Sequence, residues 1–206
     1  MKKSLLLIFG LVLTLFSCGN EKANKLQETA EDIRKEASEM AEDVAEEIDN
    51  QTKSFEVKVL KDDIPSPRKE MTGSIGDVNI TVNYGSPSVK ERTVWGELVP
   101  YNEVWRTGAN EATTIEFSKD VMIEGKALPA GKYGLFTVIS EDKWTFIFNS
   151  TSDQWGAYEY DESKDVIRVD TTPQMEEKSS ETMEFSIDGS DVVLTWDKMS
   201  GGFEVQ

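Results

Sequence analysis

The 206-residue chain contains no histidine and only one cysteine, Cys18. Histidine is the commonest general base and a common metal ligand, so its absence excludes Ser-His and Cys-His nucleophile systems and the usual zinc sites. A single cysteine excludes a disulfide within the monomer. We therefore expect no metal and no cofactor. Any chemistry would rest on carboxylates, tyrosines, lysines or a cation bound by oxygen atoms.

Positive charge is also scarce. The chain has 22 lysines and arginines against 39 aspartates and glutamates, which gives a formal net charge of −17. Such a surface repels nucleic acid and anionic lipid headgroups. We therefore expect no nucleic-acid partner and no docking of the protein surface on an anionic bilayer.

The first residues have the pattern of an export signal. Two lysines, Lys2 and Lys3, precede a predominantly apolar run from Leu5 to Phe16, which is too short for a dedicated membrane span. This pattern predicts a signal peptide over residues 1–17 that takes no part in the fold.

The end of this run, Leu15-Phe16-Ser17-Cys18, resembles the lipobox of bacterial lipoproteins. The resemblance implies that Cys18 carries acyl chains such as palmitate and becomes the mature N-terminus of a membrane-anchored lipoprotein. Several acyl chains on one residue anchor a protein stably, whereas one chain holds it marginally. Gly19 after the cysteine resembles lipoproteins sorted to an outer membrane, and the membrane face stays open. The alternative is a plain signal peptide with an accidental cysteine.

Residues 18–53 are expected to form a lipidated N-terminus and a helical spacer. Residues 19–53 are rich in Glu, Ala, Asp and Lys, and they contain no proline or aromatic residue. An eleven-residue pattern repeats, AEDIRKEASEM from Ala30 and AEDVAEEIDNQ from Ala41, and it places a narrow apolar stripe on one helix face. We predict an acidic amphipathic helix that holds the following domain away from the lipid. A self-associating helix or one docked on the domain is the alternative.

Residues 54–206 have the texture of an all-β domain. Short runs of β-branched and aromatic residues alternate with turn signals every eight to twelve residues, which predicts one antiparallel β-sandwich or squat barrel. The predicted strands are 55–60, 71–75, 77–84, 112–117, 120–124, 133–140, 143–150, 165–171, 182–188 and 191–196, with GFEVQ at an edge.

Two irregular segments interrupt the strands, at 85–111 and 150–165. Both combine aromatic residues with acids and amides, and long loops of this kind are usually packed on the domain or functional. Aromatic faces beside polar groups suit a glycan, so the rings are candidate ligand contacts. The alternative is that they fasten the loops as small cores. The candidate aromatic residues are Trp95, Trp105, Trp155, Tyr158 and Tyr160.

Three stretches resemble a known family. YGSPSVKERTVWGELVPYNEVWRTGANEATTI, LPAGKYGLF and QWGAYEYD look like the signature of the domain of unknown function 2911, which occurs in exported bacterial proteins. The resemblance covers roughly Asp77 to Pro173. It implies a β-rich domain outside the cytoplasm and carries no activity over to this chain.

An arginine and a glutamate flank the turn in WRTGANEATTIEF. If a strand starts at Glu111, its side chain shares the core face with Ile115 and Phe117. A carboxylate that leaves water needs a partner, and Arg106 lies five residues upstream. We therefore predict an Arg106–Glu111 ion pair, or a pair of Arg106 with another acid of the loop, that pins the long loop to the sandwich. The alternative is that Arg106, with Asn110 and Glu111, binds an anionic or hydroxyl-bearing ligand.

The acids allow a weaker hypothesis of catalysis. Two carboxylates at a suitable separation would suffice for a glycosidase, although no spacing singles out a pair. The most consistent interpretation is a non-catalytic binding module for a small molecule, a glycan or an envelope protein. A carboxylate-dependent hydrolase and a purely structural envelope component are the alternatives. The acids available in or beside the irregular segments are Glu97, Glu103, Glu111, Asp153, Glu159 and Asp161.

Overall fold

A computed structural model describes residues 34–35 and 54–206 of the protein. Arg34 and Lys35 are helical and exposed. The predicted signal peptide, Cys18 and the remainder of the predicted helix lie outside the described residues. Residues Lys53–Gln206 form one compact unit. In the part of the chain that the structure describes, no helix is long and apolar enough to cross a membrane.

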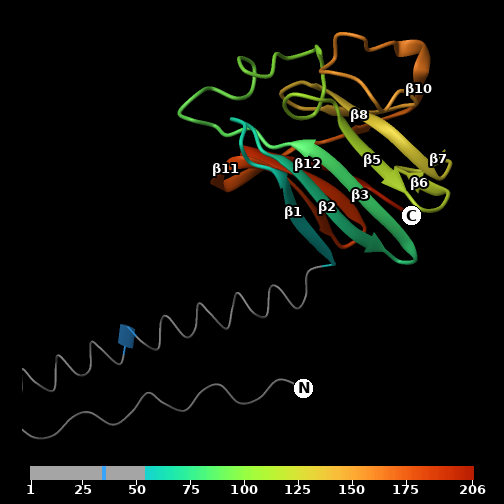
Figure 1. Ribbon diagram of the computed structural model, residues 1–206, viewed down its shortest axis with the longest axis horizontal. Helices are drawn as coiled ribbons and strands as arrows, with labels where there is room; N and C mark the ends of the chain where they lie inside the picture. The colour runs from blue at the N-terminus through green and yellow to red at the C-terminus, as the bar shows by residue number, and fades with distance from the viewer. Residues whose placement is uncertain (1–33, 36–53) are drawn as a thin grey trace, which may run out of the picture. The chain divides into compact units, whose positions relative to one another are not determined.

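The largest element is an antiparallel sheet of eight strands (Figure 1). Across the sheet lie β1 (Phe55–Lys61), β2 (Arg68–Ile75), β3 (Val78–Gly85), β5 (Thr113–Phe117), β8 (Gly131–Ile139), β9 (Trp144–Asn149) and β10 (Asp165–Thr171), and β4 (Val104–Trp105) pairs with β8. Strands β1 and β10 end the series without pairing to each other. The sheet therefore does not close, and the predicted alternative of a squat barrel is wrong.

Two hairpins complete the domain. One consists of β6 (Val121–Ile123) and β7 (Lys126–Leu128), and the other of the long strands β11 (Gln174–Asp188) and β12 (Asp191–Glu204). The β11–β12 hairpin contributes Phe185, Leu194 and Trp196 to the hydrophobic core that the large sheet also lines. Sheet and hairpin therefore bury one common core between them (Figure 1).

Alternation along the strands explains how this core forms. In β3 the side chains of Val78, Ile80, Val82 and Tyr84 are buried, as their period of two predicts. Strands β8 and β9 are apolar on both faces because a second, smaller cluster lies on the opposite side. Its buried members are Ala112, Phe136 and Ile147, and Tyr160 packs against it.

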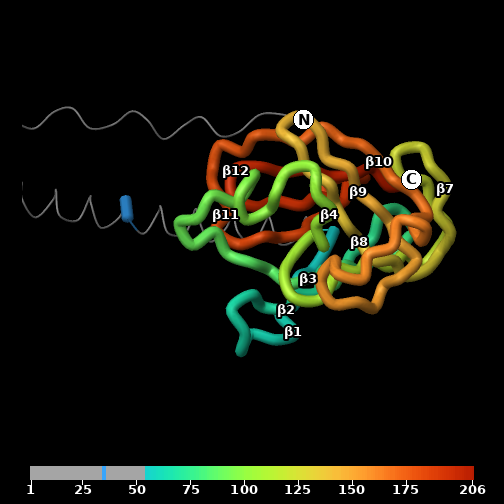
Figure 2. Tube along the Cα trace, turned by 90° about the horizontal axis from the view of Figure 1, so that it is seen from above, coloured from blue at the N-terminus to red at the C-terminus, as the bar shows by residue number. Residues whose placement is uncertain are grey.

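Two long irregular segments join these strands. The first loop comprises residues 86–112 between β3 and β5 and includes β4, and the second loop comprises residues 150–164 between β9 and β10 and includes a short 3-10 helix, Glu162–Lys164. Figure 1 shows both loops in its upper part, and Figure 2 views the domain from that side. A β-bridge between Glu111 and Trp155 joins them. The chain therefore brings two segments about forty residues apart to one end of the domain.

Candidate functional site

Tryptophans fasten the first loop. The ring of Trp95 lies with its centroid 6.1 Å from Trp105, 5.1 Å from Trp144 of β9 and 5.7 Å from Trp196 of β12. Trp105 also stacks on Trp196 at 6.1 Å with an interplanar angle of 20°. Trp105 is only 8% exposed. Trp95 and Trp105 thus serve as the small core that was one of the two interpretations of these rings.

The turn after Trp105 is held in a strained conformation. Thr107 has φ of 54°, an uncommon value for a β-branched residue that costs of order 1–3 kcal/mol. The surroundings fix it: its hydroxyl lies 2.8 Å from that of Thr137, and its carbonyl accepts a 2.7 Å hydrogen bond from the Thr113 hydroxyl. The indole N–H of Trp105 donates to the carbonyl of Gly108 at 3.1 Å. These contacts set the direction of Arg106, between Trp105 and Thr107.

The loop returns very close to the end of β3. A Cβ on Gly85 would lie 2.1 Å from the carbonyl oxygen of Ala109, so only glycine fits there. The N–H of Ala109 donates to the Gly85 carbonyl at 3.2 Å, and the hydroxyl of Ser86 donates to the Met183 carbonyl at 2.7 Å. The backbone around Arg106 is therefore anchored independently of the arginine side chain.

Arg106 itself has no ion-pair or hydrogen-bond partner among the residues that the structure describes. Its side chain is half-buried, and its Nε atom is buried without a hydrogen-bond acceptor. Within residues 34–35 and 54–206 its guanidinium forms no ion pair and no hydrogen bond. Burial lowers the pKa of Arg106, and only the nearby Tyr158 acts in the opposite direction. The protein thus holds a cation partly out of water at a site where no acid of the described residues neutralises it.

The predicted Arg106–Glu111 pair is not formed. Strand β5 begins at Thr113, so Glu111 precedes it and its side chain is exposed instead of turned into the core. The carboxylate of Glu111 lies 3.9 Å from Nη1 of Arg68. Arg68 also donates to Asn83 Oδ1 at 2.6 Å and to the Ala112 carbonyl at 3.4 Å. Arg68, at the start of β2, therefore fulfils the pinning role that was predicted for Arg106.

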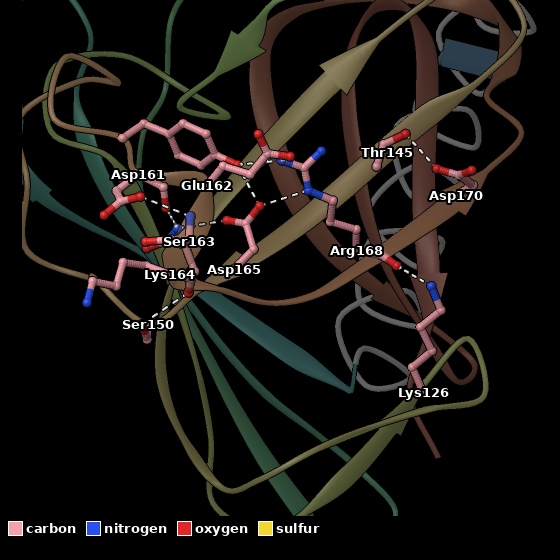
Figure 3. A network of polar contacts seen from close by, with 12 residues as sticks. Lys126, Thr145, Ser150, Asp161, Glu162, Ser163, Lys164, Asp165, Arg168 and Asp170 are labelled. Atoms are coloured by element: carbon pink, nitrogen blue, oxygen red, sulfur yellow. Dashed lines mark hydrogen bonds and ion pairs between the residues drawn. The ribbon is translucent and has the colours of Figure 1, made fainter.

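The second loop is fastened by polar contacts (Figure 3). The Asp165 carboxylate, 9% exposed, accepts hydrogen bonds from the Tyr160 hydroxyl at 2.6 Å, Nε of Arg168 at 2.8 Å and Nδ2 of Asn149 at 2.7 Å. Nη2 of Arg168 lies 3.0 Å from Glu162 and donates to the Tyr160 hydroxyl at 2.8 Å. We call Asn149, Tyr160, Asp165 and Arg168 the Asp165 network.

Within the Asp165 network, Tyr160 has a structural role. Burial, followed by the hydrogen bond to Asp165, raises the pKa of Tyr160 to about 12. The ring packs on Phe136 with centroids 5.0 Å apart. Tyr160 was a candidate ligand contact, but its hydroxyl and one ring contact are already used to hold the second loop on the sheet.

The other two candidate rings of the second loop face solvent. Trp155 is 59% exposed and Tyr158 is 88% exposed. The N–H of Gly156, between them, donates to the Asn110 carbonyl at 3.1 Å. A Cβ on Gly156 would lie 3.2 Å from the Tyr158 ring and 3.9 Å from Cδ of Arg106. Exposed aromatic surface therefore lies next to the unpaired arginine, and Asn110 lies at the junction of the loops.

A pocket of about 240 Å³ opens beside this junction, with Arg92, Trp105, Arg106, Asn110 and Trp196 among its lining residues. No carboxylate of the described part of the chain lines it. A carboxylate-dependent hydrolase needs two acids that face a common space. This pocket therefore does not supply such a pair of acids.

Comparison with protein families gives one match. The family described as protein of unknown function (DUF2911) matches residues 66–205. The comparison with curated proteins found no match, and the comparison with solved structures found none. The matched span contains both loops, the Asp165 network and the pocket.

Proposed function

This chain belongs to the DUF2911 family of proteins of unknown function, and we propose that it is a non-catalytic binding module of the cell envelope. Its ligand is a small molecule, a glycan or an envelope protein, and the first and second loops form the binding surface. The observation that supports this most directly is the half-buried Arg106, which has no ion pair within residues 34–35 and 54–206 and lies near the exposed ring of Tyr158, on the same loop as the exposed ring of Trp155. The remainder of both loops is fastened without these three side chains.

Exposed rings favour a ligand with apolar C–H faces and polar groups. Single exposed apolar residues are normal on a protein surface, but here Trp155 and Tyr158 are three residues apart on one loop, and Tyr158 lies near the cation of Arg106. Tryptophan and tyrosine are enriched where an interface needs both an apolar body and a polar tip. A saccharide presents both kinds of surface. A glycan is therefore the class of ligand that suits this surface best.

The place of the domain in the cell is part of the proposal. The domain is a β-sandwich of the large sheet and the β11–β12 hairpin, carried by an acidic helical spacer over residues 18–53. Acylated Cys18 tethers it to a membrane, of which the outer membrane is our choice. The lipobox-like residues before Cys18 and the low basic content of the chain support a lipid tether over electrostatic adhesion. Mass spectrometry of the mature chain would contradict this tether by finding Cys18 unmodified.

A thermal-shift screen tests the binding function. Residues Lys53–Gln206 form a compact unit with its own core, so this fragment should melt cooperatively on its own. Neutral and acidic glycans, envelope fragments and divalent cations are the ligands to screen. A ligand at 100 times its Kd should stabilise the fragment by about 2.7 kcal/mol.

Two variants locate the binding surface. Trp155→Ala combined with Tyr158→Ala should abolish the shift and leave the melting temperature of the free fragment nearly unchanged, because both rings are exposed. Met175→Ala is the matched control, since Met175 of β11 is 77% exposed and lies outside both loops. If no ligand class shifts the melting temperature, a purely structural role is favoured. A shift that survives the double substitution would move the binding surface elsewhere.

A further inference from the structure

The arginines of the described domain divide into two kinds. Arg68 and Arg168 each lie within 4 Å of at least one carboxylate. Arg92 and Arg106 form no ion pair within residues 34–35 and 54–206, and both line the same pocket. Arg92 is exposed and donates to the Val89 and Ser88 carbonyls, whereas Arg106 is half-buried, so the second arginine is the unexpected one in a protein with 39 acids and only 22 basic residues. The pocket is therefore a local site of positive charge on a negatively charged molecule.

Donors without acceptors accompany these charges. The Nε of Arg106 and the indole Nε1 of Trp196 are both buried, neither has a hydrogen-bond partner, and both residues line the pocket. Buried donors are nearly always satisfied, and each exception needs an explanation. Nε of Arg92 already donates to the Val89 carbonyl at 3.0 Å, which orients its guanidinium without neutralising it. The Nε1 atoms of Trp95 and Trp144, outside the pocket lining, also lack partners within the described residues, so the indole alone does not mark a site. The buried Nε of Arg106 belongs to a charged group, and a negatively charged acceptor would satisfy both its charge and its hydrogen bond.

We infer that the pocket binds the oxyanion of a ligand, a carboxylate or a phosphate or sulfate group. This inference rests on the proposed binding function and names the chemistry that the ligand carries. Arg106 holds the oxyanion with two parallel N–H donors, the geometry in which arginine binds carboxylates and phosphates most strongly. A volume of about 240 Å³ lies below the roughly 300–1,000 Å³ of pockets that enclose a whole drug-sized ligand. That space admits the charged end of a ligand, and Trp155 and Tyr158 contact the part that stays outside.

Tryptophan fluorescence of the full-length chain in a non-ionic detergent measures this binding, because Trp105 and Trp196 line the pocket. The probes are glucuronate, glucose 6-phosphate, inorganic phosphate and glucose, each titrated at constant ionic strength. Glucuronate or a phosphate-bearing probe should give a saturable change, and glucose should bind at least tenfold more weakly. The two anionic sugars distinguish a carboxylate ligand from a phosphate ligand.

Variants test whether Arg106 makes the contact. Arg106→Gln should weaken binding of the anionic probe about tenfold or more, and Arg106→Lys should retain part of it, because the charge remains but the two-donor geometry is lost. Lys119→Gln is the matched control. It removes the same charge at an exposed site after β5, where Lys119 pairs with Asp77. It should leave the affinity unchanged.

Several results would overturn the inference. It fails if glucose binds as tightly as glucuronate and glucose 6-phosphate, in which case the proposed binding function still stands. It also fails if anions bind equally well to Arg106→Gln, or if Lys119→Gln weakens them as much. If no anion changes the fluorescence, NMR of a chain with ¹⁵N-labelled arginine is the second measurement. The site is rejected if no anion shifts the Nε–H resonance of Arg106. If Arg106→Gln does not fold, the affinity of Arg106→Lys for the anionic probe is compared with that of the unsubstituted chain instead.

Discussion

The two loops at one end of the domain are fastened by opposite chemistry. The first loop is held by tryptophan rings and backbone hydrogen bonds, while the second is held by the Asp165 network of a carboxylate, an arginine, a tyrosine and an amide. Two arginines allow a comparison, Arg106 in the first loop and Arg168 after the second. The two arginines differ in their electrostatic surroundings, just as the two loops differ in the contacts that hold them.

The pKa shifts of the two arginines run in opposite directions. Burial would lower the pKa of Arg168, but the hydrogen bond and charge of Asp165, together with Tyr160, outweigh it and the pKa is raised. Burial lowers the pKa of Arg106, and nothing outweighs it. The charge of Arg168 is therefore stabilised by contacts that also hold the fold. The burial of Arg106 is unfavourable, and no ion pair of the described residues compensates for it. Burial lowers the pKa of Arg68 as well, so what sets Arg106 apart is that it has no ion pair within the described residues.

The largest effect should come from breaking the tryptophan cluster. Trp95→Ala removes a ring that contacts three other tryptophans and should lower the free energy of unfolding by about 3 kcal/mol. Trp155→Ala, at an exposed ring of the second loop, should change it by less than about 0.5 kcal/mol. Urea unfolding of both variants measures the difference. Equal losses would mean that the rings of the first loop do not fasten it.

A smaller effect is expected from the Asp165 network. Asp165→Asn removes the negative charge that three donors share and should lower the free energy of unfolding by about 2 kcal/mol. Glu162→Gln, whose side chain is 76% exposed, should cost less than about 0.5 kcal/mol, although it also contacts Arg168. The same urea titration compares the two. A comparable cost for both would show that the second loop is held by its ring contacts alone.

Much of the sheet could be predicted from residue alternation, and the exceptions have a common cause. Strand β3 shows its buried face in a period of two, so the sequence alone reveals it. Strand β11 begins at Gln174, well before the predicted 182, because its first residues are polar and mostly exposed and leave no alternation to detect. Strand β12 continues to Glu204 through Asp197, which has φ of 52°, where the pattern suggested an interruption. The short strands β4 and β7 offer two and three residues, too few for a period.

The site was predictable in composition but not in pairing. The sequence indicated that the two loops carry the aromatic and polar residues, and the structure joins them through Glu111 and Trp155. The partner of Glu111 was assigned by closeness in sequence, whereas the true partner, Arg68, lies 43 residues away and arrives through the register of β2 on β3. Register over such a distance leaves no local signal. Tyr160 differs, since its partners Asp165 and Arg168 lie only five and eight residues further along the chain.

The smallest effect on stability is expected at Arg106. This effect tests most directly whether the arginine of the first loop differs from Arg168. Arg106→Gln removes a cation that has no ion pair and whose burial is unfavourable, so the melting temperature should stay the same or rise by a degree or two. Arg68→Gln is the matched control: it removes the same charge together with hydrogen bonds to Asn83 and Ala112, and should lower the melting temperature by several degrees. Differential scanning calorimetry of the two variants measures this. A loss of several degrees in Arg106→Gln would show that Arg106 is fastened by the fold like Arg168, which would leave no spare cation for a ligand.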